Sequence, residues 1–185
     1  NPLEQALNMQ EIIMSWDCTF KEGDDKDYVV GQVWGRKGAD KFLLDQVRGQ
    51  WSINTTLSEM KRLSAKWPQA SRKMIEDRAN GPAVISLLKH EISGIVPVSP
   101  GQDSKLTRAL AAAPEIEAGN VYLPRPKYAP WLHDLVSELC DFPSGKHDDQ
   151  VDALTYALNY FRNSSRRVVL PKVPNKIIRV GGGWE

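Results

Sequence analysis

Residues 12–47, IIMSWDCTFKEGDDKDYVVGQVWGRKGADKFLLDQV, contain three apolar segments separated by polar turns. Residues 12–15 form a short apolar stretch that ends at Trp16 and Asp17, and residues 28–34 and 41–47 have the composition of two further strands. Because the links between the strands are polar and mostly short, we expect antiparallel hairpins. The chain is therefore predicted to begin with a three-stranded antiparallel sheet.

Beyond residue 50, segments with helical spacing alternate with strand-like segments. The expected helices cover 55–67, 83–91, 103–113, 130–140 and 148–161, and the expected strands cover 72–77, 94–100 and 120–123. Strands followed by such an alternation favour an α/β fold, in which a central mixed sheet of antiparallel and then parallel strands is flanked by helices. With 185 residues, 41% of them hydrophobic, we expect a single domain over 1–185, with a core at about 12–161.

Composition excludes several classes of protein. Cys18 and Cys140 are the only cysteines, which is too few for a disulfide framework and favours a reducing compartment. No apolar run approaches the ~18 residues of a membrane span, and no export signal is recognised. The net charge is only +1, but the C-terminal tail, residues 162–185, is rich in Lys and Arg. Such a tail suits contacts with phosphate groups, although a solvated tail has the same composition.

Carboxylates occur at the ends of three predicted elements: Asp17 after the first strand, Glu76 and Asp77 after the fourth, and Asp148 and Asp149 at the start of the last helix. Strand ends are where an open sheet presents its chemistry. Helical spacing predicts that the acids of the last helix face away from its apolar side. Acids in a first helical turn are also explained by capping and the helix dipole. Together, without nearby cysteines, these carboxylates favour hard cations such as Mg²⁺ or Mn²⁺.

Several basic residues are candidates for contact with a nucleic-acid backbone. Lys105 and Arg108 share one face of a predicted helix, and Arg36 and Lys37 lie at a predicted hairpin tip. Solvent-facing side chains would show the same spacing. The last candidates precede the acid pair of the final helix: His147 and Lys146, either of which could hold a phosphate or assist proton transfer.

The strings MSWDCTF, MIEDRANGPAVISLL, SKLTRALAAAPEIEAGNVYLP and HDDQVDALTYALNY, in this order, closely resemble the nuclease domain of tailed-phage terminase large subunits. The resemblance covers about residues 12–161 and implies a ribonuclease H-like fold with a central mixed sheet. It further implies a DNA endonuclease that cuts concatemeric viral double-stranded DNA during packaging, with little sequence preference. The implied cofactor is a pair of divalent ions, Mg²⁺ or Mn²⁺.

The resemblance also implies roles for individual residues. Asp17 would contact both ions, Asp77 would hold one ion from the fourth strand, and Asp149, with Asp148 beside it, would hold the other. Glu76 is the alternative to Asp77, since neighbours on a strand face opposite sides and only one of them can face the site; we favour Asp77.

The packaging motor needs an ATP-binding loop of the form G-x-x-x-x-G-K-[ST], and this string does not occur, so no ATPase domain is expected within these residues. In a full-length protein the implied partners are an ATPase domain, the small terminase subunit and the portal, in the host cell cytoplasm. Two alternatives remain open. One is another ribonuclease H-like nuclease, such as a junction resolvase or a transposase core. The other is a non-catalytic module that binds a portal.

Overall fold

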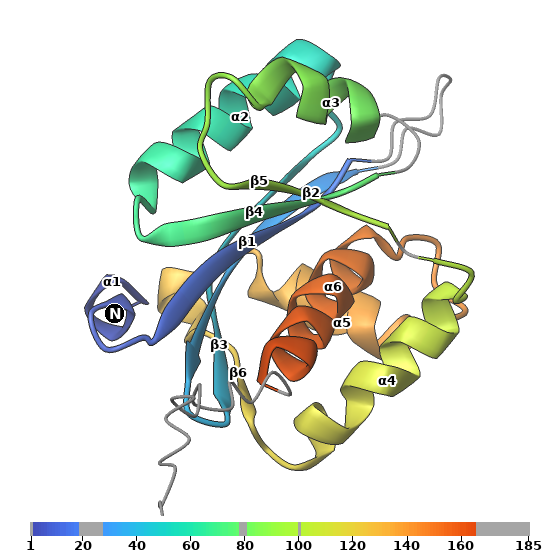
Figure 1. Ribbon diagram of the computed structural model, residues 1–185. Coiled ribbons are helices and arrows are strands. Elements are labelled where there is room, and N and C mark those ends of the chain that lie inside the picture. The colour runs from blue at the N-terminus through green and yellow to red at the C-terminus, as the bar shows by residue number, and fades with distance from the viewer. Residues whose placement is uncertain (1, 19–27, 78–80, 100, 166–185) are drawn as a thin grey trace, which may run out of the picture.

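The computed structural model describes residues 2–18, 28–77, 81–99 and 101–165, which form a mixed six-stranded sheet with helices on both faces (Figure 1). The sheet order is β5-β4-β1-β2-β3-β6. The strands are β1 (Glu11–Asp17), β2 (Val29–Lys37), β3 (Asp40–Gly49), β4 (Ala70–Glu76), β5 (Ile95–Val98) and β6 (Val121–Tyr122). The helices are α1 (Pro2–Ala6), α2 (Ile53–Lys66), α3 (Gly81–Leu88), α4 (Lys105–Glu117), α5 (Leu132–Asp141) and α6 (Asp149–Ser165), with a 3₁₀ turn, η1, at Pro126–Tyr128.

The antiparallel and parallel halves of the sheet meet at β1. β1 pairs antiparallel with β2, and β2 pairs antiparallel with β3, whereas the β1–β4, β4–β5 and β3–β6 pairs are parallel. The predicted α/β class and the order of antiparallel and then parallel strands are therefore confirmed. Two elements of the structure, α1 and η1, were not expected from the sequence.

The two faces of the sheet support two cores. Met14, Trp16 and Ile75 lie in the core beneath α2 and α3, and Ile13 and Met74 lie in the core against α4, α5 and α6. Figure 1 shows the same division, with α2 and α3 above the sheet and α4, α5 and α6 below it. Alternation thus assigns the side chains of β1, and those of β4 from Arg72 onward, to a face.

β2 is buried along most of its length because it lies in the middle of the sheet and both of its faces are covered. Gly31 of β2 is the register partner of Trp16, and a Cβ at this position would overlap the Trp16 ring. The absence of a side chain at Gly31 therefore allows the indole to lie flat against the sheet. Trp16, Trp34 and Trp67 are all buried, as is usual for structural tryptophans.

α6 is buried on all sides over residues 149–158. We expected its acids to face away from its core contact, but that side is not open to solvent, since Asp149 and Asp152 are only 4% and 2% exposed. The physical reason is that α6 packs on β1 and β2 with one side, and α4 and α5 pack against its others.

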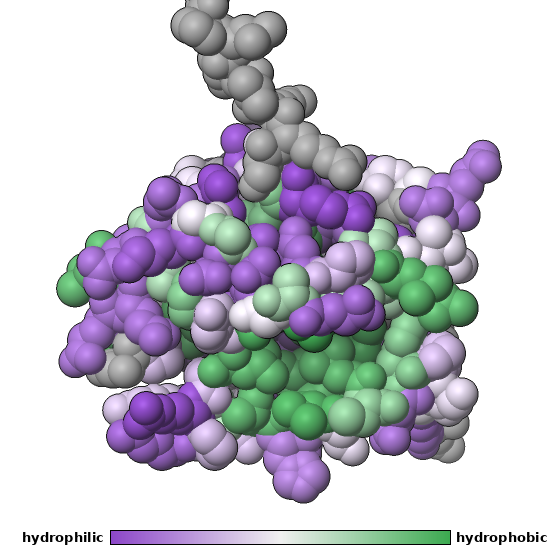
Figure 2. Space-filling view, turned by 90° about the horizontal axis from the view of Figure 1, so that it is seen from below, coloured by the Kyte–Doolittle hydropathy of each residue, from purple (hydrophilic) through white to green (hydrophobic). Residues whose placement is uncertain are grey.

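The outer side of the lower helical layer remains partly apolar. Figure 2, seen from below, shows a hydrophobic area bordered by hydrophilic residues. The exposed large hydrophobic side chains of α4 and α5 are Leu106, Leu110, Ile116 and Val136. Within the described ranges, no helix combines the length and the apolar character needed to cross a membrane.

Candidate functional site

Two carboxylates end neighbouring parallel strands and share one face of the sheet. Asp17 is the last residue of β1 and Glu76 the last of β4, and the residues before them, Trp16 and Ile75, are register partners. Side chains at alternate positions share a face, so Asp17 points to the same side as Ile13, and Glu76 to the same side as Met74. Both carboxylates therefore belong to the face covered by α6.

Asp77 lies beyond the end of β4 and does not follow Glu76 onto this face. Its side chain is exposed, and its backbone N–H donates to the Val98 carbonyl at 2.8 Å. The strand geometry places Glu76 on the α6 side, whereas the sequence favoured Asp77 as the residue that faces the site. The physical reason is the strand phase, because Met74 occupies the α6 side and places Glu76, two residues later, on that side.

Two titratable groups lie near these carboxylates: Cys18, in the core beneath α2 and α3, and Tyr156, on α6. Burial raises the pKa of the Cys18 thiol, and the nearby Asp17 and Glu76 carboxylates raise it further. Burial also raises the pKa of the Tyr156 phenol, with Glu76 as the next contribution. The Asp17 and Glu76 carboxylates thus both lie near Cys18, and Glu76 also lies near Tyr156 of α6.

The first turn of α6 lies over the central strands. The Gln32 side chain on β2 donates from Nε2 to the Gln150 carbonyl at 3.2 Å. Gln32 is the register partner of Ser15, and Ser15 shares its face with Asp17 two residues later. Asp149, which precedes Gln150 and is buried, is thus brought to the sheet face that carries Asp17.

α4 supplies two cations to the acids of this turn. The Lys105 ammonium lies 2.7 Å from Asp148 Oδ1 and 2.6 Å from Asp152 Oδ2, and Arg108 Nη2 lies 2.8 Å from Asp152 Oδ1. Burial lowers the pKa of Lys105, but hydrogen bonds to Asp148 and Asp152 raise it by more, so the net shift is upward. The buried Asp152 carboxylate is thus paired with two cations.

The predicted DNA contact by Arg108 is not supported. Its residue exposure is only 8%, its guanidinium is engaged by Asp152, and it also lies 5.0 Å from the centre of the Tyr156 ring. Burial lowers the pKa of Arg108, and Tyr156 and Asp152 raise it by more. Arg108 therefore stabilises α6 instead of reaching outward, whereas Lys105 keeps 46% of its side chain exposed.

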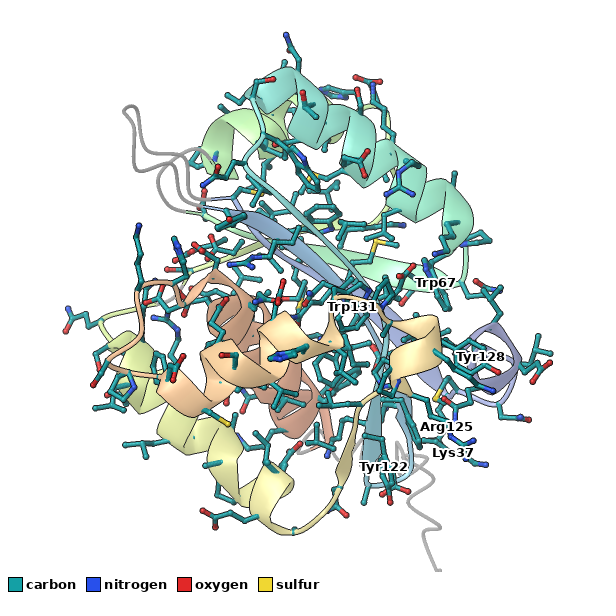
Figure 3. All side chains as sticks on the ribbon, turned by 180° about the vertical axis from the view of Figure 1, so that it is seen from behind. Lys37, Trp67, Tyr122, Arg125, Tyr128 and Trp131 are labelled. Atoms are coloured by element: carbon teal, nitrogen blue, oxygen red, sulfur yellow. The ribbon has the colours of Figure 1, made fainter. Side chains whose placement is uncertain are left out.

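The remaining basic candidates lie in different places. His147 Nδ1 lies 4.0 Å from Asp149 Oδ2 and its ring meets the Tyr28 ring edge-on, so His147 adjoins the site, and Lys146 beside it is exposed. Arg36 pairs with Glu11 at the other end of β1. Lys37 is exposed, and Figure 3 shows it at the end of the molecule that carries Tyr122 and Arg125. The basic tail from residue 166 onward lies outside the described residues.

The residue types fit a hard divalent cation, since the site offers carboxylate oxygens and no accessible thiol. In the described part of the chain, no three His, Cys, Asp or Glu side chains are grouped closely enough to hold an ion. The carboxylates of Asp17, Glu76 and Asp149 thus share a region without forming a tight cage. Tyr156 was missed from sequence, although its position four residues after Asp152 places it on the same helix side.

A mixed sheet with acids at two adjacent strand ends and at the start of the covering helix defines a ribonuclease H-like fold. Residues 14–161 match the family model described as the terminase RNaseH-like domain, and the chain belongs to this family. No curated protein sequence matches the chain.

Solved structures show the same fold. The large terminase nuclease of thermophilic phage G20c with bound zinc has a TM-score of 0.63 and 20% identity, over 82% of this chain and 81% of that one. The nuclease domain of the SPP1 large terminase with bound Mn has a TM-score of 0.59 and 14% identity, over 85% and 90%. The large terminase of a second thermophilic bacteriophage has a TM-score of 0.60 and 12% identity; the match covers 83% of this chain but only 40% of that longer one.

Proposed function

We propose that this chain is a metal-dependent endonuclease that cleaves double-stranded viral DNA during genome packaging, with Asp17, Glu76 and Asp149 as its metal ligands. The observation that carries the proposal is the shared face of Asp17 and Glu76 beneath the first turn of α6. Family membership supports a nuclease, and carboxylates from separate elements are the ligands that a phosphodiesterase needs for hard cations.

A pair of divalent ions, when bound, supplies the Lewis acidity that activates water and stabilises the leaving oxygen of a phosphodiester. The chain's own residues supply the charge and the positions. Asp17 lies at the end of a central strand. The neighbouring strand β4 carries Glu76, and the helix that covers this face, α6, carries Asp149. Lys105 pairs with both Asp148 and Asp152 while 46% of its side chain remains exposed, so it is placed to contact an approaching phosphate.

Mg²⁺ or Mn²⁺ is the proposed cofactor. The SPP1 nuclease domain carries Mn, and a G20c nuclease structure carries magnesium. Since the longer large terminase is more than twice the length of its matched region, we propose that this domain works beside an ATPase domain, the small terminase subunit and the portal. Lys105, Lys146, His147 and Lys37 are the proposed contacts to the DNA backbone, which would give little sequence preference.

Digestion of supercoiled plasmid tests this proposal. Mn²⁺ or Mg²⁺ should support cleavage, and Ca²⁺ or a chelator should not. Asp17→Asn and Glu76→Gln should each abolish cleavage while the circular dichroism spectrum is unchanged. Asp77→Asn is the matched control, because it alters the adjacent carboxylate on the other side, and it should cleave like the wild type.

The outcomes separate the possibilities. Loss of cleavage in Asp77→Asn with retention in Glu76→Gln would show that the strand-face assignment of the ligands is wrong. Cleavage by none of the proteins with any metal would favour a non-catalytic module. Preference for a four-way junction or an RNA–DNA hybrid over linear duplex would indicate a different ribonuclease H-like nuclease.

A further inference from the structure

Glu138 on α5 is a buried carboxylate whose two oxygens both accept hydrogen bonds at the start of α6. Oε1 accepts from the backbone N–H of Gln150 at 2.7 Å and of Val151 at 3.4 Å. Oε2 accepts from Gln150 Nε2 at 2.5 Å and from Arg48 Nη2 at 3.3 Å. The residue is only 8% exposed. Its charge is therefore committed to this one helix end.

These contacts replace the ordinary cap of the helix. α6 begins at Asp149, so Asp148 is in the position whose side chain usually accepts from the second or third helical N–H. The Asp148 side chain instead accepts from Lys105. The N–H groups of Gln150 and Val151 are satisfied by Glu138 from a different helix. A negative charge there is also favoured by the helix dipole.

Gln150 connects this cap to the sheet. Its side chain is fully buried, and its Oε1 accepts from Gln46 Nε2 at 2.8 Å. Gln46 Oε1 accepts from Gln32 Nε2 at 2.8 Å, and Gln32 Oε1 accepts from Trp34 Nε1 at 2.9 Å. A continuous run of buried hydrogen bonds thus joins α5, the start of α6, β3 and β2.

Arg48 is the cation that pairs with the Glu138 carboxylate. Its guanidinium lies 3.7 Å from the centre of the Tyr28 ring, and Tyr28 meets His147 edge-on. The cation and the N–H donors offset part of the desolvation cost of burying this carboxylate. The same contacts restrain the first turn of α6 against moving away from the sheet and against rotating about the helix axis.

We propose that Glu138 is a positioning residue that fixes the first turn of α6 so that Asp149 meets the carboxylates at the strand ends; this rests on the proposed metal-dependent nuclease function. Glu138 itself contacts neither metal nor DNA. Outer residues that orient metal ligands typically change metal affinity or activity by about 10–100-fold when removed. The effect of losing Glu138 should therefore appear as weaker metal binding.

Glu138→Gln is the variant to test, since the amide keeps the size but places an N–H₂ group against a donor. We expect the Mn²⁺ concentration for half-maximal plasmid cleavage to rise by about tenfold or more. Mn²⁺ affinity, measured without DNA by titration of free Mn²⁺ by electron paramagnetic resonance, should weaken in parallel. Cleavage should recover at high Mn²⁺.

Asp45→Asn is the matched control. Asp45 accepts from Trp67 Nε1 and Lys66 Nζ, which anchor α2, and Asn at this position keeps an oxygen that can accept from the Gln46 backbone N–H. It should lower Tm while leaving the Mn²⁺ affinity unchanged. If Glu138→Gln lowers Tm and keeps its Mn²⁺ affinity within about twofold of the wild type, the positioning role is refuted.

A second variant keeps the test decisive if Glu138→Gln does not fold. Gln150→Met leaves the Glu138 carboxylate on the backbone N–H groups but removes the link to Gln46. It should weaken Mn²⁺ binding less than Glu138→Gln would, yet measurably, and unchanged affinity would refute the role. Failure of the wild-type protein to bind Mn²⁺ or cut DNA would instead refute the proposed function.

Discussion

Arg108→Met should destabilise the protein strongly, because it leaves a buried carboxylate with one cation fewer. Asp152 is 2% exposed and Arg108 Nη2 lies 2.8 Å from it. Removing one partner of a buried ion pair costs about 3–5 kcal/mol. Lys105 remains 2.6 Å from Asp152, so we expect the lower end, about 3 kcal/mol. For a chain of 185 residues this corresponds to a fall in Tm of about 6–12 °C.

Chemical denaturation and thermal melting of Arg108→Met measure this loss directly. The double variant Arg108→Met with Asp152→Leu should recover part of the stability, because no buried charge is left unpaired. The DNA affinity of the folded protein, measured by fluorescence anisotropy on a fixed duplex in Ca²⁺, should equal that of the wild type.

An exposed ion pair contributes only about 0–1 kcal/mol. A loss in that range for Arg108→Met would refute the structural role. If the slope of log affinity for DNA against log salt concentration also fell by about one, the expectation that Arg108 contacts a phosphate would be supported.

Three further predictions concern other parts of the molecule. Gly81→Ala should lower stability by more than about 1 kcal/mol in urea unfolding and weaken Mn²⁺ binding, because its Cβ would overlap the backbone carbonyl of Glu76. Lys37→Ala should leave Tm unchanged and reduce the salt slope of DNA binding by about one, and an unaltered slope would exclude it as a phosphate contact. Burial and the Glu11 hydrogen bond raise the pKa of Tyr160 from 10.0 to about 12, so the folded state keeps this proton longer than the unfolded state. The resulting stability is complete below pH 10 and is lost as pH rises toward 12, and urea midpoints of Tyr160→Phe should fall less over this range than those of the wild type.

The strands were predictable because their patterns reflect burial that the sequence itself shows. Asp17 could be placed at a strand end because the apolar run before it is short and unambiguous. The choice between Glu76 and Asp77 could not be made in the same way. A one-residue shift in the register of β4 would invert which neighbour faces the site, and the positions of Met74 and Ile75 in opposite cores fix this register.

The environment of the α6 acids was not predictable, since it depends on how two other helices, α4 and α5, pack against α6. Helical spacing described α6 as having one apolar side, and it could not show that α4 and α5 close over the other. The interactions of Arg108 and Glu138 with α6 link residues that are distant in sequence. Neither partner carries a local signal that distinguishes a buried ion pair from a solvated one.

Three aspartates in one helical turn do not amount to three metal ligands. Asp152 is neutralised by Arg108 and Lys105, and Asp148 is engaged by Lys105 at the helix start. The capping role that such acids often fill belongs here to Glu138. We propose that Asp149, at the positive end of the helix dipole, is the metal ligand of this turn. On this proposal, the surrounding charges, and not the number of acids, distinguish Asp149 from Asp148 and Asp152.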